Sequence, residues 1–98
     1  MAKRSVPLIV VASRSVPFAE DVAARLRRDG STVYVTHSLN GCLRVATSVA
    51  PDVVLLDAGF PPRLEALLHA HPTSARAEIL HLTEDMVPRE VPMVLHAA

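Results

Sequence analysis

The chain alternates short apolar runs with longer stretches in which apolar residues recur at helical spacing. Short segments rich in β-branched and aliphatic residues predict strands at 8–12 (LIVVA), 32–36 (TVYVT), 53–56 (VVLL) and 77–83 (AEILHLT). The continuous run at 8–12 is typical of a strand buried on both faces of a sheet. Between these segments the pattern predicts helices from Pro17 to Gly30, from Ser38 or Asn40 to Pro51, and over 63–70. The predicted order is therefore β-α-β-α-β-α-β.

Polar residues and prolines mark the ends of these elements. Ser15 is placed to cap the first helix, and either Ser38 or Asn40 can cap the second. A further run, Val91 to His96, is a candidate fifth strand, in which Pro92 favours an edge position or a place among the strand's first residues.

Strands that alternate with helices predict a parallel sheet with helices on both faces. At 98 residues the chain is expected to form one domain. Within it, residues 1–5 are expected to be an N-terminal tail, and residues 86–98 an atypical C-terminal segment that forms an edge strand or an exchanged strand.

Charge and cysteine content exclude several functions. Ten basic residues balance ten acidic ones, so there is no electrostatic reason to expect a nucleic-acid or membrane partner. The cluster Arg25, Arg27 and Arg28 is expected to end the first helix, where cations complement the helix dipole. A single cysteine, Cys42, and no signal-peptide pattern predict a cytoplasmic protein.

Candidate chemistry gathers where the predicted strands end, because ligands of open parallel sheets bind beyond the carboxyl ends of the strands. That edge collects Ala12, Ser13 and Arg14, then Asp57, then Thr83, Glu84 and Asp85. The three glycines cannot form a nucleotide-binding loop, and no G-x-S-x-G sequence anchors a hydrolase triad.

The segments LIVVASRSVPFAEDVAARLRRDG, PDVVLLDAGFP and EILHLTE together resemble the receiver domain of two-component response regulators over residues 6 to 85. The resemblance implies a flavodoxin-like α/β fold, a doubly wound parallel sheet of four to five strands, truncated at its C-terminal end. It also implies that Asp57 stands at the phosphoacceptor, Thr83 at the switch hydroxyl and Gly59 at the residue whose backbone carbonyl helps to bind Mg²⁺.

The chain departs from the receiver pattern at the positions that hold the metal. Receivers place an acidic pair directly after the first strand, whereas Ala12 and Ser13 stand there in this chain. Since Mg²⁺ is held by carboxylates together with phosphate oxygens, no metal is expected, unless Asp57 and the Gly59 carbonyl hold it alone or Glu84 or Asp85 assists. No lysine follows Lys3, so the late lysine that contacts the phosphate in receivers is also missing.

Two readings of Asp57 stay open. It either accepts a phosphoryl group, or it accepts hydrogen bonds from nearby backbone N–H groups or from the Ser13 hydroxyl. Arg14 is a candidate cation for this pocket that pairs with Asp57 or an anion; otherwise it is a solvent-facing loop arginine.

Other polar residues give weaker signals. His69 and His71 are expected at a helix end, where they cap the helix in preference to binding metal. His81 is expected to be a partly buried, hydrogen-bonded histidine, and Cys42 a packed, unreactive thiol.

Three hypotheses follow for function. The first is a degenerate receiver-like signalling domain, not an enzyme, that binds a protein partner and is phosphorylated weakly or not at all. It is expected to form a homodimer, and a histidine kinase is a candidate partner. The second is a working phosphoacceptor that switches through Asp57 and Thr83, and the third is a small α/β ligand-binding or enzymatic domain with a pocket near Ser13 and Thr83. The sequence leaves open the pathway and whether the chain is part of a larger regulator.

Overall fold

The computed structural model describes residues 6–82, which form a parallel sheet of four strands flanked by three helices. The elements follow the predicted order. They are β1 (Leu8–Ala12), α1 (Val16–Arg28), β2 (Thr32–Thr36), α2 (Leu39–Val49), β3 (Val53–Asp57), α3 (Pro62–Ala70) and β4 (Glu78–Leu82). Some predictions fall outside the described residues. They concern the segments 1–5 and 86–98 and the residues Thr83, Glu84 and Asp85.

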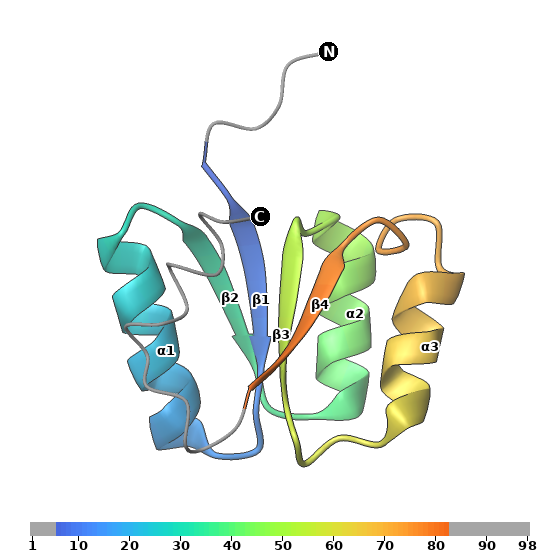
Figure 1. Cartoon of the computed structure of the whole chain (residues 1–98), viewed down its shortest axis with the longest axis horizontal. Helices are drawn as coiled ribbons and strands as arrows, with labels where there is room; N and C mark the ends of the chain where they lie inside the picture. The colour runs from blue at the N-terminus through green and yellow to red at the C-terminus, as the bar shows by residue number, and fades with distance from the viewer. Residues whose placement is uncertain (1–5, 83–98) are drawn as a thin grey trace.

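The sheet has the strand order β2-β1-β3-β4, with all neighbouring pairs parallel. The chain leaves β1 toward β2 on one side and returns to place β3 on the other, so the winding direction changes between β1 and β3. Helix α1 covers one face of the sheet, and α2 and α3 cover the other (Figure 1). The doubly wound α/β prediction is therefore confirmed for the described part of the chain.

Each face of the sheet has its own hydrophobic core, because successive side chains of a strand point to opposite faces. On the α1 side Ile9, Val11 and Leu55 pack against Ala19, Val22, Ala23 and Leu26 of the helix. On the other side Val10, Val54 and Leu56 pack against Cys42, Ala46, Leu64 and Leu68. The central strands β1 and β3 are buried on both faces, which explains their unbroken apolar sequences.

Helix starts agree with the capping residues predicted from sequence. The Ser15 hydroxyl accepts a hydrogen bond from the Phe18 N–H at 3.4 Å, and the Ser38 hydroxyl accepts one from Gly41 N–H at 3.0 Å. Ser38, and not Asn40, is therefore the cap of α2. Arg25, Arg27 and Arg28 occupy the last turn of α1, as expected.

Exposure is not uniform along these elements. Ala50 is exposed and has a left-handed backbone that ends α2, whereas Cys42 packs in the core, as expected. Leu67 of α3 is 44% exposed. His81, expected to be partly buried, is exposed, because it lies toward the end of the outermost described strand of the sheet.

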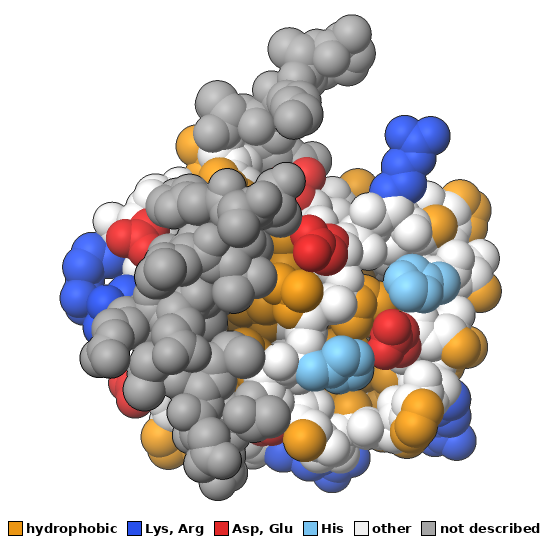
Figure 2. Space-filling model, in the orientation of Figure 1, with side chains coloured by type: hydrophobic (Ala, Val, Ile, Leu, Met, Phe, Trp, Pro, Cys, Tyr) orange, Lys and Arg blue, Asp and Glu red, His pale blue; other side chains and the backbone are white. Residues whose placement is uncertain are grey.

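No helix within residues 6–82 combines the length and the apolar character needed to cross a lipid bilayer. On the face shown in Figure 2, basic and acidic side chains are interspersed among hydrophobic ones, and neither sign gathers into a continuous patch.

Candidate functional site at the carboxyl ends of β1 and β3

Ser13 and Asp57 meet where the winding direction of the sheet changes. Ser13 follows β1 directly, and Asp57 is the last residue of β3. Strands β1 and β3 pair in parallel with Ala12 opposite Leu56, so the residues that follow lie side by side at one edge of the sheet. The Ser13 hydroxyl donates a hydrogen bond of 2.6 Å to Asp57 Oδ2.

Both carboxylate oxygens of Asp57 accept hydrogen bonds from the protein itself. Oδ2 accepts from Ser13, and Oδ1 accepts from the backbone N–H of Ala58 at 2.6 Å. The sequence-based alternative to phosphorylation is that Asp57 accepts hydrogen bonds from a nearby backbone N–H or from the Ser13 hydroxyl. The structure contains both. Whether Asp57 also accepts a phosphoryl group stays a prediction.

Ser13 is fully buried and is held in place from three directions. Its hydroxyl oxygen accepts a hydrogen bond from Ser15 N–H at 3.0 Å, and its backbone N–H donates to the carbonyl of Thr36 at 3.1 Å. Its own carbonyl lies 2.9 Å from Nδ1 of His37. The hydroxyl that contacts Asp57 is therefore fixed by β1, β2 and the turn that enters α1.

His37 was missed at the sequence level, although it could have been found. It follows β2 directly, so it lies at the same edge of the sheet as Ser13 and Asp57. The rule that gathers residues at the carboxyl ends of parallel strands applies to β2 as well as to β1 and β3.

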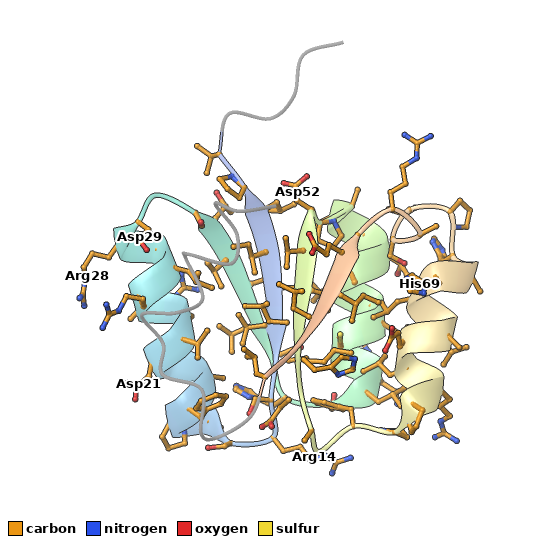
Figure 3. All side chains as sticks on the ribbon, viewed as in Figure 1. Arg14, Asp21, Arg28, Asp29, Asp52 and His69 are labelled. Carbon is orange, nitrogen blue, oxygen red and sulfur yellow. The ribbon has the colours of Figure 1, made fainter. Side chains whose placement is uncertain are left out.

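Arg14 forms no ion pair with Asp57. Its guanidinium carbon lies 5.5 Å from the centre of the Phe60 ring, within the range of a cation–π contact. Its aliphatic stem passes Gly59 so closely that a Cβ on Gly59 would lie 3.3 Å from Arg14 Cδ. The residue is exposed at the lower end of the molecule in Figure 3, opposite the end that carries Asp52.

The residues that follow β1 do not supply the ligands that an acidic pair would offer to Mg²⁺. Ala12 has no ligating atom, and its side chain belongs to the core that packs against α2 and α3. Ser13 offers a neutral hydroxyl that is already bonded to Asp57. Within residues 6–82, no three His, Cys, Asp or Glu side chains lie close enough together to hold a metal ion. A hard divalent cation usually takes one or two carboxylates, and this edge of the described chain supplies Asp57 alone.

A cavity of about 300 Å³ opens beside Asp57 on the α3 side of the sheet. Two residues that line it, His81 and Glu65, form a solvent-exposed pair that joins β4 to α3, with His81 Nε2 3.0 Å from Glu65 Oε1. The cavity is lined by Leu56, Asp57, Ala58, Phe60, Pro61, Pro62, Glu65 and His81. It does not include Ser13, near which the ligand-binding hypothesis placed its pocket.

Cys42 and the histidines of α3 take structural positions. Cys42 is buried, and burial raises the pKa of its thiol to about 11, with a hydrogen bond to Thr36 acting in the opposite direction. His71 caps the C-terminal end of α3, and its Nδ1 accepts a hydrogen bond from Thr73 N–H at 3.1 Å. His69 lies in the last turn of α3, with its exposed side chain at the surface (Figure 3).

Comparison with known proteins supports the fold. No protein-family model matches the sequence, and no curated protein matches it significantly. Solved structures that match include the chemotaxis response regulator CheY4 of Vibrio cholerae, at a TM-score of 0.75 and 17% identity over 90% of this chain and 77% of that one. The N-terminal domain of a response regulator receiver protein from Methanoculleus marisnigri matches at a TM-score of 0.73 and 24% identity, over 91% and 76% of the two chains.

The signal receiver domain of the response regulator NarL from Mycobacterium tuberculosis also matches, at a TM-score of 0.70 and 22% identity, over 95% of this chain and 78% of that one. At these identities the likeness establishes the fold, which is the flavodoxin-like fold of receiver domains. It does not by itself carry the chemistry of those proteins over to Asp57.

Proposed function

We propose that this chain, which has the fold of response regulator receiver domains, is a receiver-like signalling domain that works by binding a protein partner and is phosphorylated at Asp57 weakly or not at all. The observation that carries the proposal is the 2.6 Å hydrogen bond from Ser13 to Asp57. A neutral hydroxyl occupies the position at which a receiver has a metal-binding carboxylate, and it engages the carboxylate that would have to attack a phosphoryl donor.

The physical reason lies in the charge that phosphoryl transfer develops. Bound cations neutralise the charge on the transferred group, and the protein contributes mainly positioning and electrostatic stabilisation. At this edge Arg14 is the nearest basic side chain along the chain to Ser13, but its guanidinium lies over Phe60. The donors that Asp57 does have, the Ser13 hydroxyl and the Ala58 N–H, are neutral and supply no such neutralising charge.

The partner is proposed to be a protein, with self-association into a homodimer as one form and a histidine kinase as another candidate. The balanced formal charge and the interspersed surface charges in Figure 2 give no support to a nucleic-acid or membrane partner. We further propose that the domain acts in the cytoplasm and by binding, without an enzymatic turnover of its own.

A second candidate function is a working phosphoacceptor. It is favoured by one observation, namely that Asp57 is only partly buried and borders the cavity beside α3, so a small donor can approach it. In that case Thr83 would be the switch hydroxyl.

Incubation with Mg²⁺ and a small acyl phosphate, or with BeF₃⁻, distinguishes the two. Intact-mass spectrometry is expected to show no phosphoryl adduct on the wild-type protein, and ¹⁹F NMR no bound BeF₃⁻. The variant Ser13→Asp restores a carboxylate next to Asp57, and we expect it to gain an adduct that depends on Mg²⁺. Stoichiometric phosphorylation of the wild type that disappears in Asp57→Asn would establish the second function and refute the first.

A further inference from the structure

Strand β2 forms one edge of the sheet that residues 6–82 build, and the backbone N–H and carbonyl groups of two of its five residues point away from β1. In a parallel pair, alternate residues of an edge strand bond to the neighbouring strand. Thr32 N–H donates to the Pro7 carbonyl at 2.9 Å, and the Thr36 carbonyl accepts from Ser13 N–H at 3.1 Å. Thr32, Tyr34 and Thr36 therefore face β1, and the N–H and carbonyl groups of Val33 and Val35 face outward.

One of these outward groups is already occupied. Arg27, in the last turn of α1, donates a hydrogen bond of 2.9 Å from Nη2 to the carbonyl of Val33. No hydrogen bond from within residues 6–82 reaches the outward groups of Val35. The strand itself contains neither a charged residue nor a proline, the usual devices that keep an edge from pairing with another chain. Within residues 6–82, the hydrogen bond from Arg27 is the feature that opposes pairing of this edge with another strand.

The sequence of β2 reads the same in both directions, Thr-Val-Tyr-Val-Thr. Two copies placed antiparallel about a two-fold axis at Tyr34 would set Val33 opposite the partner's Val35, and Val35 opposite the partner's Val33. Both residues of each pair direct their N–H and carbonyl groups outward, so each pair can exchange two hydrogen bonds, as antiparallel hydrogen-bonded pairs do. Such a contact is self-complementary, which a two-fold dimer requires.

Side chains agree with this register. Tyr34, which is 41% exposed, would lie directly opposite the partner's Tyr34, in the type of pair where side chains approach most closely. Val33 and Val35 would extend the core that packs against α1. A formal net charge of zero removes long-range repulsion between two copies.

We propose that the β2 edge is a self-association site at which a second copy of this chain pairs in the register centred on Tyr34, in competition with the Arg27 side chain. A five-residue edge contact falls at the small end of specific interfaces, below about 1,200 Å² of total buried surface, so the dimer is weak and concentration-dependent. The proposal does not require Asp57, and it holds whether or not that residue is phosphorylated.

Sedimentation equilibrium from micromolar to millimolar protein tests the site. Arg27→Ala frees the Val33 carbonyl, and we expect it to strengthen the dimer at least about fivefold, the effect of one net hydrogen bond. Arg28→Ala is the matched control, since Arg28 stands in the same turn and points away from the molecule in Figure 3; its dimerisation should equal that of the wild type.

Tyr34→Lys, introduced into the Arg27→Ala background, places two like charges at the two-fold axis and is expected to return the protein to a monomer, whereas Tyr34→Phe keeps the dimer. Far-UV circular dichroism and thermal melting verify that each variant is folded. A monomeric Arg27→Ala protein at every concentration overturns the proposal, and so does a dimer that Tyr34→Lys leaves unchanged.

Discussion

At the scale of single residues, the two aspartates of the segment PDVVLLD have opposite positions and different roles. Asp52 precedes β3, and its carboxylate accepts a hydrogen bond of 2.8 Å from Leu8 N–H at the start of β1. Asp57 ends β3 and accepts from Ser13 and Ala58. One carboxylate secures the amino ends of β1 and β3, and the other secures their carboxyl ends. In Figure 3 Asp52 is at the upper end of the sheet.

We predict that Ser13→Ala destabilises the protein. The substitution removes the donor to Asp57 and the acceptor of Ser15 N–H from a fully buried position. Leaving buried polar groups without partners costs about 1–3 kcal/mol, and urea denaturation should show this decrease in the free energy of unfolding.

Ser48→Ala is the matched control, because the exposed Ser48 hydroxyl bonds only to the Arg44 carbonyl within α2. Its free energy of unfolding should change by no more than about 0.5 kcal/mol. If Ser13→Ala is as stable as this control, the Ser13–Asp57 bond does not contribute to folding.

At the scale of elements, the start of α2 packs against the end of β2, close to the site. The buried Cys42 lies one turn after Ser38, the N-cap of α2, and its thiol interacts with Thr36 at the end of β2. The Thr36 hydroxyl in turn donates to the Val11 carbonyl at 3.3 Å. Helix α2 thus packs its first turns against the ends of the strands that position Ser13.

We predict that Cys42 makes stability fall with rising pH in the alkaline range. Burial raises the pKa of the folded thiol from 9.0 to about 11, so the unfolded chain releases the proton first. A raised pKa contributes stability below the unfolded value, and this contribution is lost as pH rises through the folded value. The loss is therefore expected between about pH 9 and pH 11.

Urea denaturation at several pH values in this range measures the effect, and Cys42→Ala is the comparison. The two proteins differ only at the Cys42 thiol, so the variant should lose less stability than the wild type over the same range. Parallel curves for the two proteins would show that the Cys42 thiol has the same pKa folded and unfolded.

At the scale of the whole molecule, one sheet separates two cores. The α1 core and the core beneath α2 and α3 share strands β1 and β3 but no side chains, because neighbouring strand residues point to opposite faces. The site lies at the end of these shared strands, so its geometry depends on both layers.

We predict that substitutions in the two cores act additively. Ile9→Val on the α1 side should cost about 0.5–1.5 kcal/mol, and Leu68→Ala in α3 about 2–5 kcal/mol. Distant sites without shared partners add within about 0.5 kcal/mol, so the double variant should show the sum in urea denaturation, with one cooperative transition. A coupling energy clearly above that limit would mean that the sheet transmits strain between the layers.

Much of the fold could be read from local patterns. The β-branched runs, the capping serines and the helical spacing of α1 each agree with the structure, since these signals depend on residues a few positions apart. The exposure of Leu67 and His81 could not be read in the same way. It depends on which elements pack against α3 and on the outermost position of β4 in the described sheet, neither of which a local pattern records.

The sequence by itself determined the order of the elements, the doubly wound α/β class and the edge of the sheet at which Ser13 and Asp57 meet. Only the tertiary structure decided what those residues do there. Ser13 and Asp57 are 44 positions apart, and their hydrogen bond exists because β1 and β3 pair in parallel in one register. Arg14 follows Ser13 directly, yet its side chain passes Gly59 and lies over the Phe60 ring instead of pairing with Asp57. Contacts between loops depend on geometry that sequence spacing does not specify.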